Sequence, residues 1–549
     1  MVFSSLTFLF IFLPLTLLIY YVIPGTRRKN IVLLIASLLF YAWGEPVYVV
    51  LMILSILFNY FVGLDLSDEN EARRKKSLFF GIVVNLLILG YFKYSSFLID
   101  TVNSLFGGVL AHLGGPIRNP SLPLPIGISF YTFQAMSYLV DVYRGECSPQ
   151  KRLSSFAVYI TMFPQLIAGP IVRYEDIEVA LNRRKFKPGS FLDGVLIFTK
   201  GLGKKVILAN ALGAVYTEIT VGNLGEMSAL TAWIAALCYS LQLFHDFSGY
   251  SDMAIGIGKM LGFHFPLNFD HPYRADSVTD FWRRWHISLG TWFREYVYIP
   301  LGGNRKGKGR QIINLLIVWG LTGLWHGAAW NFVAWGLYYG VLLILEKFVL
   351  ANVLKKIPAW IRRVAVFVIV VVGWVFFSHT SFTEAAAFLR VMFTGGPAHI
   401  FTDRTGLFYL ANTAVLLFAA LIPAALPIDL FGTDGRLEEE RKAERVEMEK
   451  EAIALALLEE RATGTFRTVS EEELESEEET FVPEPGLTGA GLQMYEKRRP
   501  NAVMSANAGR SHDSVLTTVV YVALATLIFA FSVAYLVSDT YNPFLYFRF

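Results

Sequence analysis

The chain has 549 residues, of which 54% are hydrophobic, 15% aromatic and only 17% charged, with a formal net charge of +3. Soluble globular proteins carry roughly 25% charged residues, so the composition excludes an ordinary soluble domain and indicates a multi-pass membrane protein. The small net charge argues against a nucleic-acid partner, and two cysteines, Cys147 and Cys238, are too few for a disulfide scaffold. We therefore expect an all-α fold built from transmembrane helices.

The expected membrane segments start near the N-terminus. No basic residue precedes the first apolar run, 6–23, so we expect it to be retained as a helix and not removed as a signal peptide. A membrane-spanning helix needs about 20 apolar residues, so the apolar runs predict roughly a dozen spans. The runs after the first cover 31–43, 47–64, 78–95, 126–142, 154–172, 191–215, 228–245, 311–326, 328–349, 361–378, 406–426 and 515–537.

Short basic segments separate many of these runs. They lie at 27–29, 73–76, 183–185, 304–310 and 355–356. The positive-inside rule would place all of them on the cytoplasmic side. They cannot all lie there if every run between them crosses the membrane once, so we expect some runs to be re-entrant or interfacial.

Glycine and proline interrupt several apolar runs. The interruptions fall at 122–127, 163–164, 168–170 and 247–252, and the last is followed by Gly256, Gly258 and Gly262. Broken backbone at membrane depth is tolerated only where protein covers it or where it lines a cavity. The pattern therefore predicts broken helices around a tunnel. The plainer alternative is that these residues are simply common in membrane helices.

The segment 434–512 differs in composition from the rest. It begins with charged residues and good helix formers and continues with an acidic block at 471–479, followed by Pro483 and Pro485. Like-charge blocks with proline are typical of disordered or partner-binding segments. We therefore divide the chain into a transmembrane core at 1–433, an acidic insertion at 434–512, and a C-terminal helix with an aromatic tail at 513–549.

Two histidines are the leading candidates for chemistry. His286 lies in a basic and aromatic segment, and helical spacing would place it on one face with Arg283. His326 lies inside an apolar run, and an ionisable residue at membrane depth marks a candidate functional site. Imidazole is the usual general base near neutral pH, and we expect Trp325 and Trp330 to keep His326 away from water. The alternative for His326 is a structural histidine that joins two helices.

Other polar groups in apolar segments have weaker signals. His245, Asp246 and Asp252, with His264 and His271 downstream, match no common metal-ligand spacing, so we expect structural hydrogen bonds and no metal site. We expect Gln165 and Asn331 to line a pore. Asp141 ends a run and is expected to face water.

Three motifs carry a resemblance to a known family. They are Trp-His286-Ile-Ser-Leu-Gly-Thr-Trp, Tyr298-Ile-Pro-Leu-Gly-Gly-Asn and Trp325-His326-Gly. In this order they resemble the membrane-bound O-acyltransferase family, in particular its bacterial polysaccharide branch. The resemblance covers the chain from end to end, apart from the acidic insertion. It implies that His326 is the catalytic base and that His286 is the second site residue.

The resemblance also implies the substrates and the setting. The acyl donor would be acetyl-CoA from the cytoplasm, bound by Arg283, Arg284 and Trp325, and no cofactor would be permanently bound. Alternatively, the arginines meet lipid headgroups. The partners would be membrane lipids, an extracytoplasmic acetyltransferase-like protein and a cell-surface polysaccharide, at a bacterial inner membrane. A homo-oligomer is left open.

The C-terminal tail offers a third candidate residue. Phe-Leu-Tyr546-Phe-Arg-Phe resembles the terminal motif of the alginate-acetylating members of this family. In the teichoic acid members a similar motif lies on a separate small peptide and is proposed to carry the acyl group, so the resemblance implies the same role for Tyr546. An interfacial aromatic anchor is the alternative. Two further functions stay open: transfer of D-alanine from a carrier protein to teichoic acid, and transport of a polysaccharide or lipid. Against transport, the sequence shows none of the paired inverted halves that transporters often have.

Overall fold

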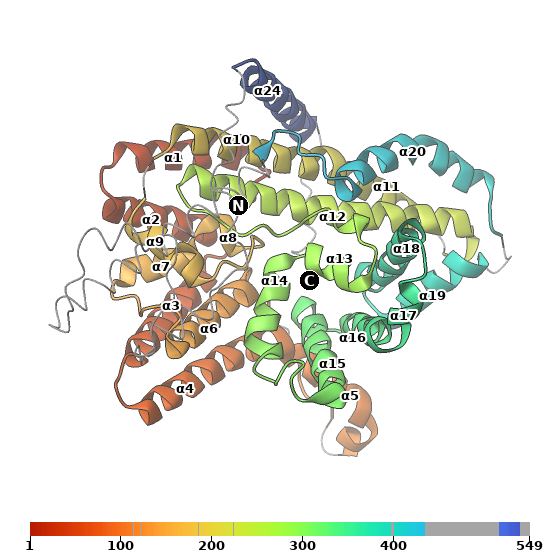
Figure 1. Cartoon of the computed structure of the whole chain (residues 1–549). Helices are drawn as coiled ribbons and strands as arrows, with labels where there is room; N and C mark the ends of the chain where they lie inside the picture. Colours follow the sequence, from red (N-terminus) through yellow and green to blue (C-terminus); the bar gives the residue numbers. More distant parts are fainter. Residues whose placement is uncertain are drawn as a thin grey trace.

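The computed structural model describes residues 1–112, 115–120, 122–184, 186–222, 224–396, 400–433 and 515–538 (Figure 1). Within these ranges the ordered elements are helices, and β pairing is limited to a single antiparallel bridge between Phe269 and Trp285. The all-α prediction is therefore confirmed. The acidic insertion and the aromatic tail with Tyr546 lie outside the described residues.

The N-terminal third forms one group of helices. The group consists of η1 (Phe8–Phe12), α1 (Leu13–Val22), α2 (Thr26–Gly44), α3 (Tyr48–Asp65), α4 (Glu71–Leu89), η2 (Gly90–Tyr94), α5 (Ser95–His112), α6 (Ile128–Arg144), α7 (Leu153–Thr161), α8 (Phe163–Leu166) and α9 (Tyr174–Asn182). The expected interruptions at 122–127, 163–164 and 168–170 all fall outside long helices. With nine and four residues, α7 and α8 are too short to cross a bilayer, which supports the prediction of re-entrant segments.

The centre of the molecule is a long buried helix, α12 (Ala229–Met260), of 32 residues. It runs alongside α10 (Pro188–Gly203), which continues through η3 (Lys204–Ala209) into α11 (Asn210–Thr220) (Figure 1). The predicted break at 247–252 is wrong, because α12 is continuous there. Its glycines serve close packing instead: a Cβ on Gly249 would lie 2.7 Å from the carbonyl oxygen of Gly201, and one on Gly256 would lie 2.6 Å from that of Gly194.

Three ion pairs also join α12 to the segment before it. Lys204 Nζ lies 2.7 Å from Asp252 Oδ2, Lys259 Nζ lies 3.0 Å from Asp193 Oδ2, and Lys205 pairs with Asp246. Charges away from water need such partners. The two carboxylates considered for a metal site, Asp246 and Asp252, are thus bound to lysines.

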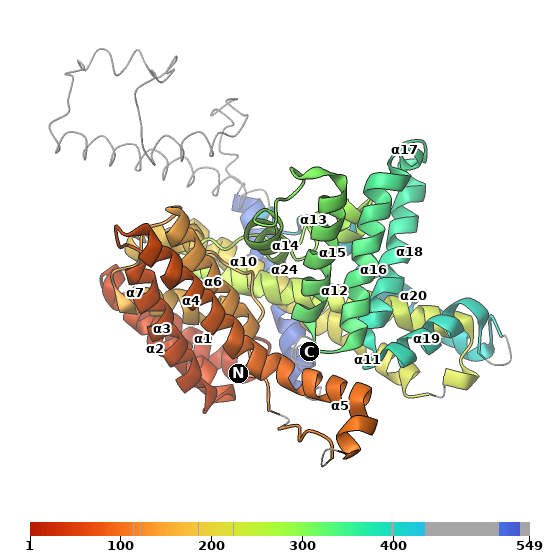
Figure 2. The ribbon, with the colours of Figure 1, turned by 90° about the horizontal axis from the view of Figure 1, so that it is seen from below.

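The C-terminal part completes the fold. It comprises η5 (Pro272–Arg274), α13 (Val278–Arg284), α14 (Ile287–Phe293), η6 (Arg294–Tyr298), α15 (Gly307–His326), α16 (Trp330–Leu345), η7 (Glu346–Leu350), α17 (Ala351–Leu354), α18 (Ala359–Ser378), α19 (Phe382–Thr394), α20 (Arg404–Ala425) and α24 (Val515–Ser538). Turned by 90°, the molecule shows α15, α16 and α18 side by side (Figure 2).

Among the described residues, six helical segments are long and apolar enough to cross a membrane, fewer than the roughly dozen runs predicted. They are Tyr48–Asp65, Glu71–His112, Trp330–Leu354, Ala359–Ser378, Arg404–Ala425 and Val515–Ser538. Several other predicted runs form buried helices such as α12. Because protein and not lipid surrounds such a helix, its surface is less apolar than that of a membrane span. The protein is therefore a multi-pass membrane protein with a protein-covered centre.

Basic helix ends gather on one side of the molecule. Arg74 at the start of α4 donates a hydrogen bond of 2.7 Å to the Tyr143 carbonyl oxygen at the end of α6. The neighbouring Arg144 donates one of 3.2 Å to the Glu295 carbonyl oxygen, close to the basic loop before α15. The starts of α4 and α15 therefore share a side, as the positive-inside rule expects for cytoplasmic ends.

Candidate functional site

His326 is the last residue of α15 and lies in an aromatic enclosure. Its ring centroid is 5.0 Å from those of Trp325 and Trp335 and 5.2 Å from that of Phe377, and only 5% of the residue is exposed. The prediction that Trp330 forms this enclosure is wrong: Trp330 is 58% exposed and packs on Phe97 instead. Trp335, more than one turn further along α16, takes its place.

Glycines explain how Trp335 reaches the histidine. A Cβ on Gly323 of α15 would lie 2.3 Å from the Phe332 carbonyl oxygen, and one on Gly336 of α16 would lie 2.2 Å from the Trp319 carbonyl oxygen. The two helices therefore approach to a distance that only glycine permits, as small residues allow in membrane proteins. This approach presses the start of α16 against the end of α15.

His286 lies between two short helices, α13 and α14, in the left-handed conformation with φ 47° and ψ 53°. The expected helical face shared with Arg283 is therefore wrong. Helix α13 ends at Arg284 because residues 284–287 pair with the extended segment 268–270. The Ile287 amide donates to the Asn268 carbonyl oxygen at 2.9 Å, and the Asp270 amide donates to the Arg284 carbonyl oxygen at 3.0 Å. This pairing turns the His286 ring inward, where 2% of the residue is exposed.

The Asn268 side chain determines which His286 nitrogen carries the proton. Its Oδ1 accepts hydrogen bonds from the Ser288 amide (3.2 Å) and the Ser288 hydroxyl (2.9 Å), whose Oγ accepts in turn from the Ile171 amide. Because that oxygen can only accept, the His286 Nδ1 atom 3.1 Å away must donate. Nε2 is then a hydrogen-bond acceptor. It is buried and has no protein partner in the described structure.

Both histidine rings lie next to the Trp325 ring. The Trp325 ring centroid lies 5.9 Å from that of His286 and 5.0 Å from that of His326. The two imidazoles also lie within electrostatic range of each other, and Lys93 lies within range of His326. The structure thus brings together three residues that the sequence singled out.

Lys93 was not predicted from the sequence. It lies in η2, and its Nζ donates hydrogen bonds to the Trp325 carbonyl oxygen and to the Ser129 hydroxyl, the latter at 3.2 Å. Beside it, the Tyr94 hydroxyl donates to the Leu324 carbonyl oxygen at 2.9 Å. Both side chains donate to carbonyl groups in the last turn of α15, where a helix cannot supply partners from its own backbone. The available signal was a single lysine inside the apolar run 78–95.

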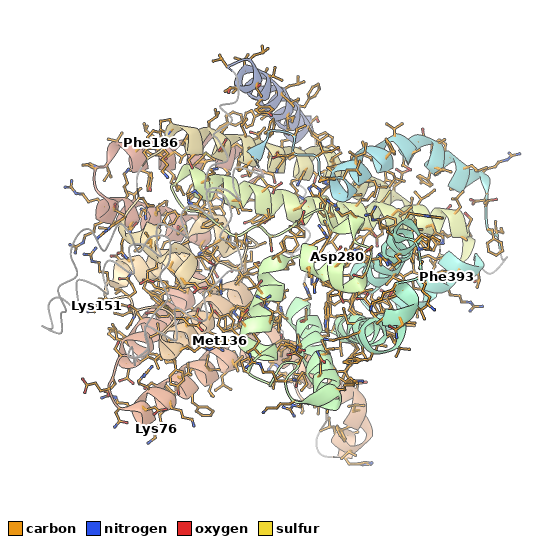
Figure 3. The ribbon with its side chains drawn as sticks, in the orientation of Figure 1. Lys76, Met136, Lys151, Phe186, Asp280 and Phe393 are labelled. Atoms are coloured by element: carbon orange, nitrogen blue, oxygen red, sulfur yellow. The ribbon has the colours of Figure 1, made fainter. Side chains whose placement is uncertain are left out.

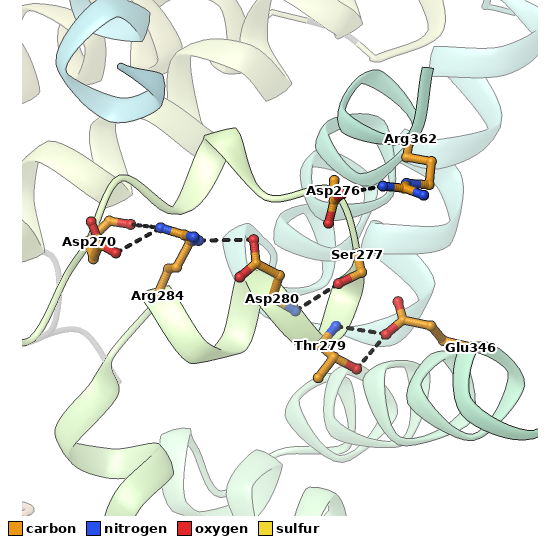
Figure 4. A network of polar contacts seen from close by, with 8 residues as sticks. All are labelled: Asp270, Asp276, Ser277, Thr279, Asp280, Arg284, Glu346 and Arg362. Carbon is orange, nitrogen blue, oxygen red and sulfur yellow. Dashed lines mark hydrogen bonds and ion pairs between the residues drawn. The ribbon is translucent and has the colours of Figure 1, made fainter. Parts of the chain in front are cut away.

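The two candidate arginines have different surroundings. Arg284 Nη1 lies 2.7 Å from Asp270 Oδ2, and its Nε lies 2.9 Å from Asp280 Oδ2, so two ion pairs hold Arg284 within the segment (Figure 4). Arg283, one position earlier, is exposed. The structure thus leaves Arg283 as the more accessible of the two for an anionic ligand.

Carboxylates secure the start of α13. Glu346 accepts hydrogen bonds from the Val278 amide (2.6 Å), the Thr279 amide (3.1 Å) and the Thr279 hydroxyl, and Asp276 pairs with Arg362 of α18. A carboxylate is favourable at this position because a helix N-terminus carries partial positive charge. Asp280 of the same helix lies near the middle of the molecule in Figure 3. These contacts fix the segment that leads to His286.

The remaining polar candidates have structural roles. His245 Nε2 lies 2.8 Å from the Ala420 carbonyl oxygen, and Gln165 donates to the Tyr159 carbonyl oxygen. Asn331 joins α16 to the end of α18 through the carbonyl oxygens of Phe376 and His379. Asp141 was expected to face water but is buried and accepts hydrogen bonds from the Tyr296 hydroxyl. A polar residue at a helix end need not be exposed when a tyrosine can pair with it.

Known proteins resemble this chain over most of its length. A model of the membrane-bound O-acyltransferase family matches residues 124–383. The chain is 40% identical over 435 residues to the probable alginate O-acetylase AlgI of Pseudomonas aeruginosa, covering 79% of this chain and 81% of that protein. It is 34% identical over 433 residues to the peptidoglycan O-acetyltransferase of Helicobacter pylori, with 71% and 80% covered. A lower identity, 28% over 259 residues with 43% and 58% covered, relates it to the teichoic acid D-alanyltransferase of Streptococcus thermophilus.

Proposed function

Because the chain belongs to the membrane-bound O-acyltransferase family, we propose that it moves acetyl groups from acetyl-CoA for the O-acetylation of a cell-surface polysaccharide. The observation that carries this proposal is the pair of buried histidines on either side of Trp325. The names of the relatives support acetyl as the acyl group and a polysaccharide as the final acceptor.

In this proposal His326 is the general base. It takes the proton from the acceptor hydroxyl as the oxygen attacks the thioester carbonyl, and it returns the proton to the leaving thiolate. The aromatic enclosure keeps water from competing with the hydroxyl. His286 presents Nε2 as an acceptor, which suits orienting a hydroxyl group. No metal and no permanently bound cofactor take part in these steps.

The basic helix ends support one direction of transfer. We propose that acetyl-CoA arrives on the side where α4 and α15 begin, which is the cytoplasmic side of a bacterial inner membrane, and that Arg283 and Arg284 lie near its phosphates. The acyl group then leaves on the opposite side through the proposed tunnel, to Tyr546 or to an extracytoplasmic acetyltransferase-like partner. Lipids surround the outer helices, and a homo-oligomer is compatible with this scheme.

The proposed function is tested in membranes that contain the protein and its partner, supplied with radiolabelled acetyl-CoA. The intact protein is expected to label the polymer. The His326→Ala variant is expected to lose at least about 100-fold in rate, because it removes the base. Normal labelling by this variant would refute the mechanism.

His379→Gln is the matched control. His379 lies at the end of α18, close to Phe377, and its Nδ1 makes hydrogen bonds of 2.8 Å with Ser378 and 2.9 Å with Val375. Burial lowers its pKa, so it is a neutral polar side chain at the assay pH, as glutamine is. We expect near-normal labelling from this variant.

The alternative donor is tested by supplying labelled D-alanine on its carrier protein in place of acetyl-CoA. If only this donor labels the polymer, the transferred group is D-alanine, as the name of the relative from Streptococcus thermophilus suggests.

A further inference from the structure

Lys93 is a charged residue within an apolar membrane segment. It is half-buried within the apolar segment Glu71–His112, one of the six candidate spans. Within the described ranges, the contacts of its ammonium group are a carbonyl oxygen, a hydroxyl group and the face of the Trp325 ring, 5.7 Å from Nζ to the centroid, and no carboxylate pairs with it. A charged side chain at membrane depth is costly, and such residues usually serve function.

The ammonium group has one donor left over. It carries three N–H bonds, of which one goes to the Trp325 carbonyl oxygen and one to the Ser129 hydroxyl. That carbonyl belongs to the peptide group that joins Trp325 to His326. Nζ therefore lies next to the peptide group of the proposed base, and its charge acts on the His326 ring.

We propose that Lys93 is a catalytic residue whose third N–H binds the carbonyl oxygen of the acyl group and stabilises the oxyanion formed during transfer. This inference rests on the proposed O-acyl transfer at His326. Acyl transfer needs a hydrogen-bond donor to the oxyanion, and neither histidine has been assigned that role.

In the step, Lys93 acts in its ammonium form and neither gains nor loses a proton. The acceptor oxygen bonds to the acyl carbon while its proton passes to His326, and the carbonyl π pair moves onto the oxygen that faces Lys93. When the carbonyl re-forms, the carbon–sulfur bond breaks, and the thiolate leaves with the bonding pair. It takes the proton from the His326 imidazolium, so an ester and a thiol result.

His286 is poorly placed for this role. Its Nδ1 proton is committed to Asn268, so its Nε2 can only accept while the ring is neutral. An oxyanion needs a hydrogen-bond donor, and a donor that also carries positive charge stabilises it more strongly in a site poor in water. In its ammonium form, Lys93 provides both the donor and the charge.

A purely structural role for Lys93 can be separated from catalysis. Tyr94, the next residue, also caps the end of α15, through the Leu324 carbonyl oxygen, but it carries no charge. The variants Lys93→Met and Tyr94→Phe each remove a cap from the same helix end. Of the two, only Lys93→Met removes the ammonium group.

The experiment uses the full chain with its partner in lipid vesicles. It measures coenzyme A release from acetyl-CoA, binding of a thioether analogue that cannot transfer its acyl group, and the melting temperature. We expect Lys93→Met to lower kcat about 100-fold, as removal of one oxyanion donor does, with KM and analogue binding nearly unchanged. Tyr94→Phe is expected to keep kcat while losing a similar amount of thermal stability. Lys93→Arg is expected to recover part of the lost rate.

Each outcome decides one question. A kcat for Lys93→Met close to that of the unchanged protein would overturn the assignment, as would equal losses of kcat in Lys93→Met and Tyr94→Phe. If Lys93→Met does not accumulate, Lys93→Gln, which keeps a neutral donor, replaces it and must also lose kcat. Absence of any release by the unchanged protein would instead refute acetyl-CoA as the donor, which is the proposed function itself.

Discussion

At the scale of single residues, the site depends on side chains that hold the two imidazoles in place. His326 is fixed by rings on three sides, so it has little freedom to turn. His286 is fixed by one amide oxygen, that of Asn268, which also binds both donors of Ser288. A small change at Asn268 is therefore expected to alter the proton position on a ring that we propose contacts the substrate.

Asn268 variants test this dependence. Asn268→Leu leaves three buried donors without an acceptor and frees the His286 tautomer, so we expect kcat to fall about 100-fold. Each donor left without an acceptor should lower the unfolding free energy by about 1–3 kcal/mol. Asn268→Asp keeps the acceptor and should retain most of the rate. Equal rates for the two variants, measured as acetyl transfer, would show that the tautomer is irrelevant.

Alanine variants of the two neighbouring arginines are expected to have different effects, one on donor binding and the other on stability. Arg283 is exposed, so Arg283→Ala should raise the KM for acetyl-CoA about tenfold, as loss of one hydrogen bond to a charged group does, with no change in melting temperature. Arg284 is held by Asp270 and Asp280, so Arg284→Ala should lower stability by about 1 kcal/mol and change KM less. Steady-state kinetics and thermal melts check both. An unchanged KM in Arg283→Ala would mean that this residue meets lipid and not the donor.

At the scale of elements, the contact between α10 and α12 is made by glycines. Gly194 and Gly201 lie about two turns apart on α10 and face Gly256 and Gly249 on α12. A Cβ on Gly201 would lie 2.4 Å from the Gly249 carbonyl oxygen, which is backbone and cannot rotate away. The spacing between these helices is therefore fixed by the absence of side chains.

Gly201→Ala should force the two helices apart. Overpacking of this kind costs about 1–3 kcal/mol, which should appear as a lower melting temperature in detergent. The matched control is Gly320→Ala in α15, where a Cβ would have no atom within 4 Å. That variant should be neutral or gain up to about 1 kcal/mol from helix propensity. Similar melting temperatures for the two variants would contradict the close-packing account.

The sequence predicts the C-terminal end of α15 and the position of His326 well, because the relevant signals are local. A run of apolar residues ends in Trp-His-Gly, and the helix ends there too. The same local signals fail for α12. Glycine is equally typical of a helix break and of a close helix contact. Which of the two forms here depends on the glycines of α10, which lie 48 positions (Gly201 to Gly249) and 62 positions (Gly194 to Gly256) earlier in the chain.

Long-range partners explain the other omissions. Lys93 binds a carbonyl group 232 positions away, so nothing near it in the sequence shows its role. Asn268 lies 18 positions before His286 in a segment without regular structure. Trp330 and Trp335 both follow His326 closely, and only the packing of α16 on α15 decides which one turns inward. Tyr546 lies outside the described residues, so its role as an acyl carrier stays a prediction.

At the scale of the whole molecule, α15 and α18 should run in the same direction through the membrane. The end of α15 meets the end of α18, where His326 packs on Phe377. Both helices start beside basic residues, at 304–310 and 355–363. The basic loop and the turn after α18 should therefore face opposite compartments.

Cysteine labelling checks this topology. Cys147 and Cys238 are buried and are first replaced by alanine, and Lys308→Cys and Glu384→Cys then place single thiols at exposed positions. A membrane-impermeant maleimide added to intact cells should label the thiol at 384 and not the one at 308. Labelling of both positions, or of 308 alone, would overturn the assignment of the basic side to the cytoplasm.

The ion pairs of α12 have a consequence for how the chain enters the bilayer during synthesis. Presented to lipid alone, α12 would carry Asp246, Asp252 and Lys259, and each charge near the centre of a span costs roughly 2.5–3.5 kcal/mol to insert. Their counter-charges reside on α10 and η3, which leave the ribosome first. We therefore expect the insertion machinery to retain the earlier segment until α12 arrives and to release the two together, as one neutralised unit.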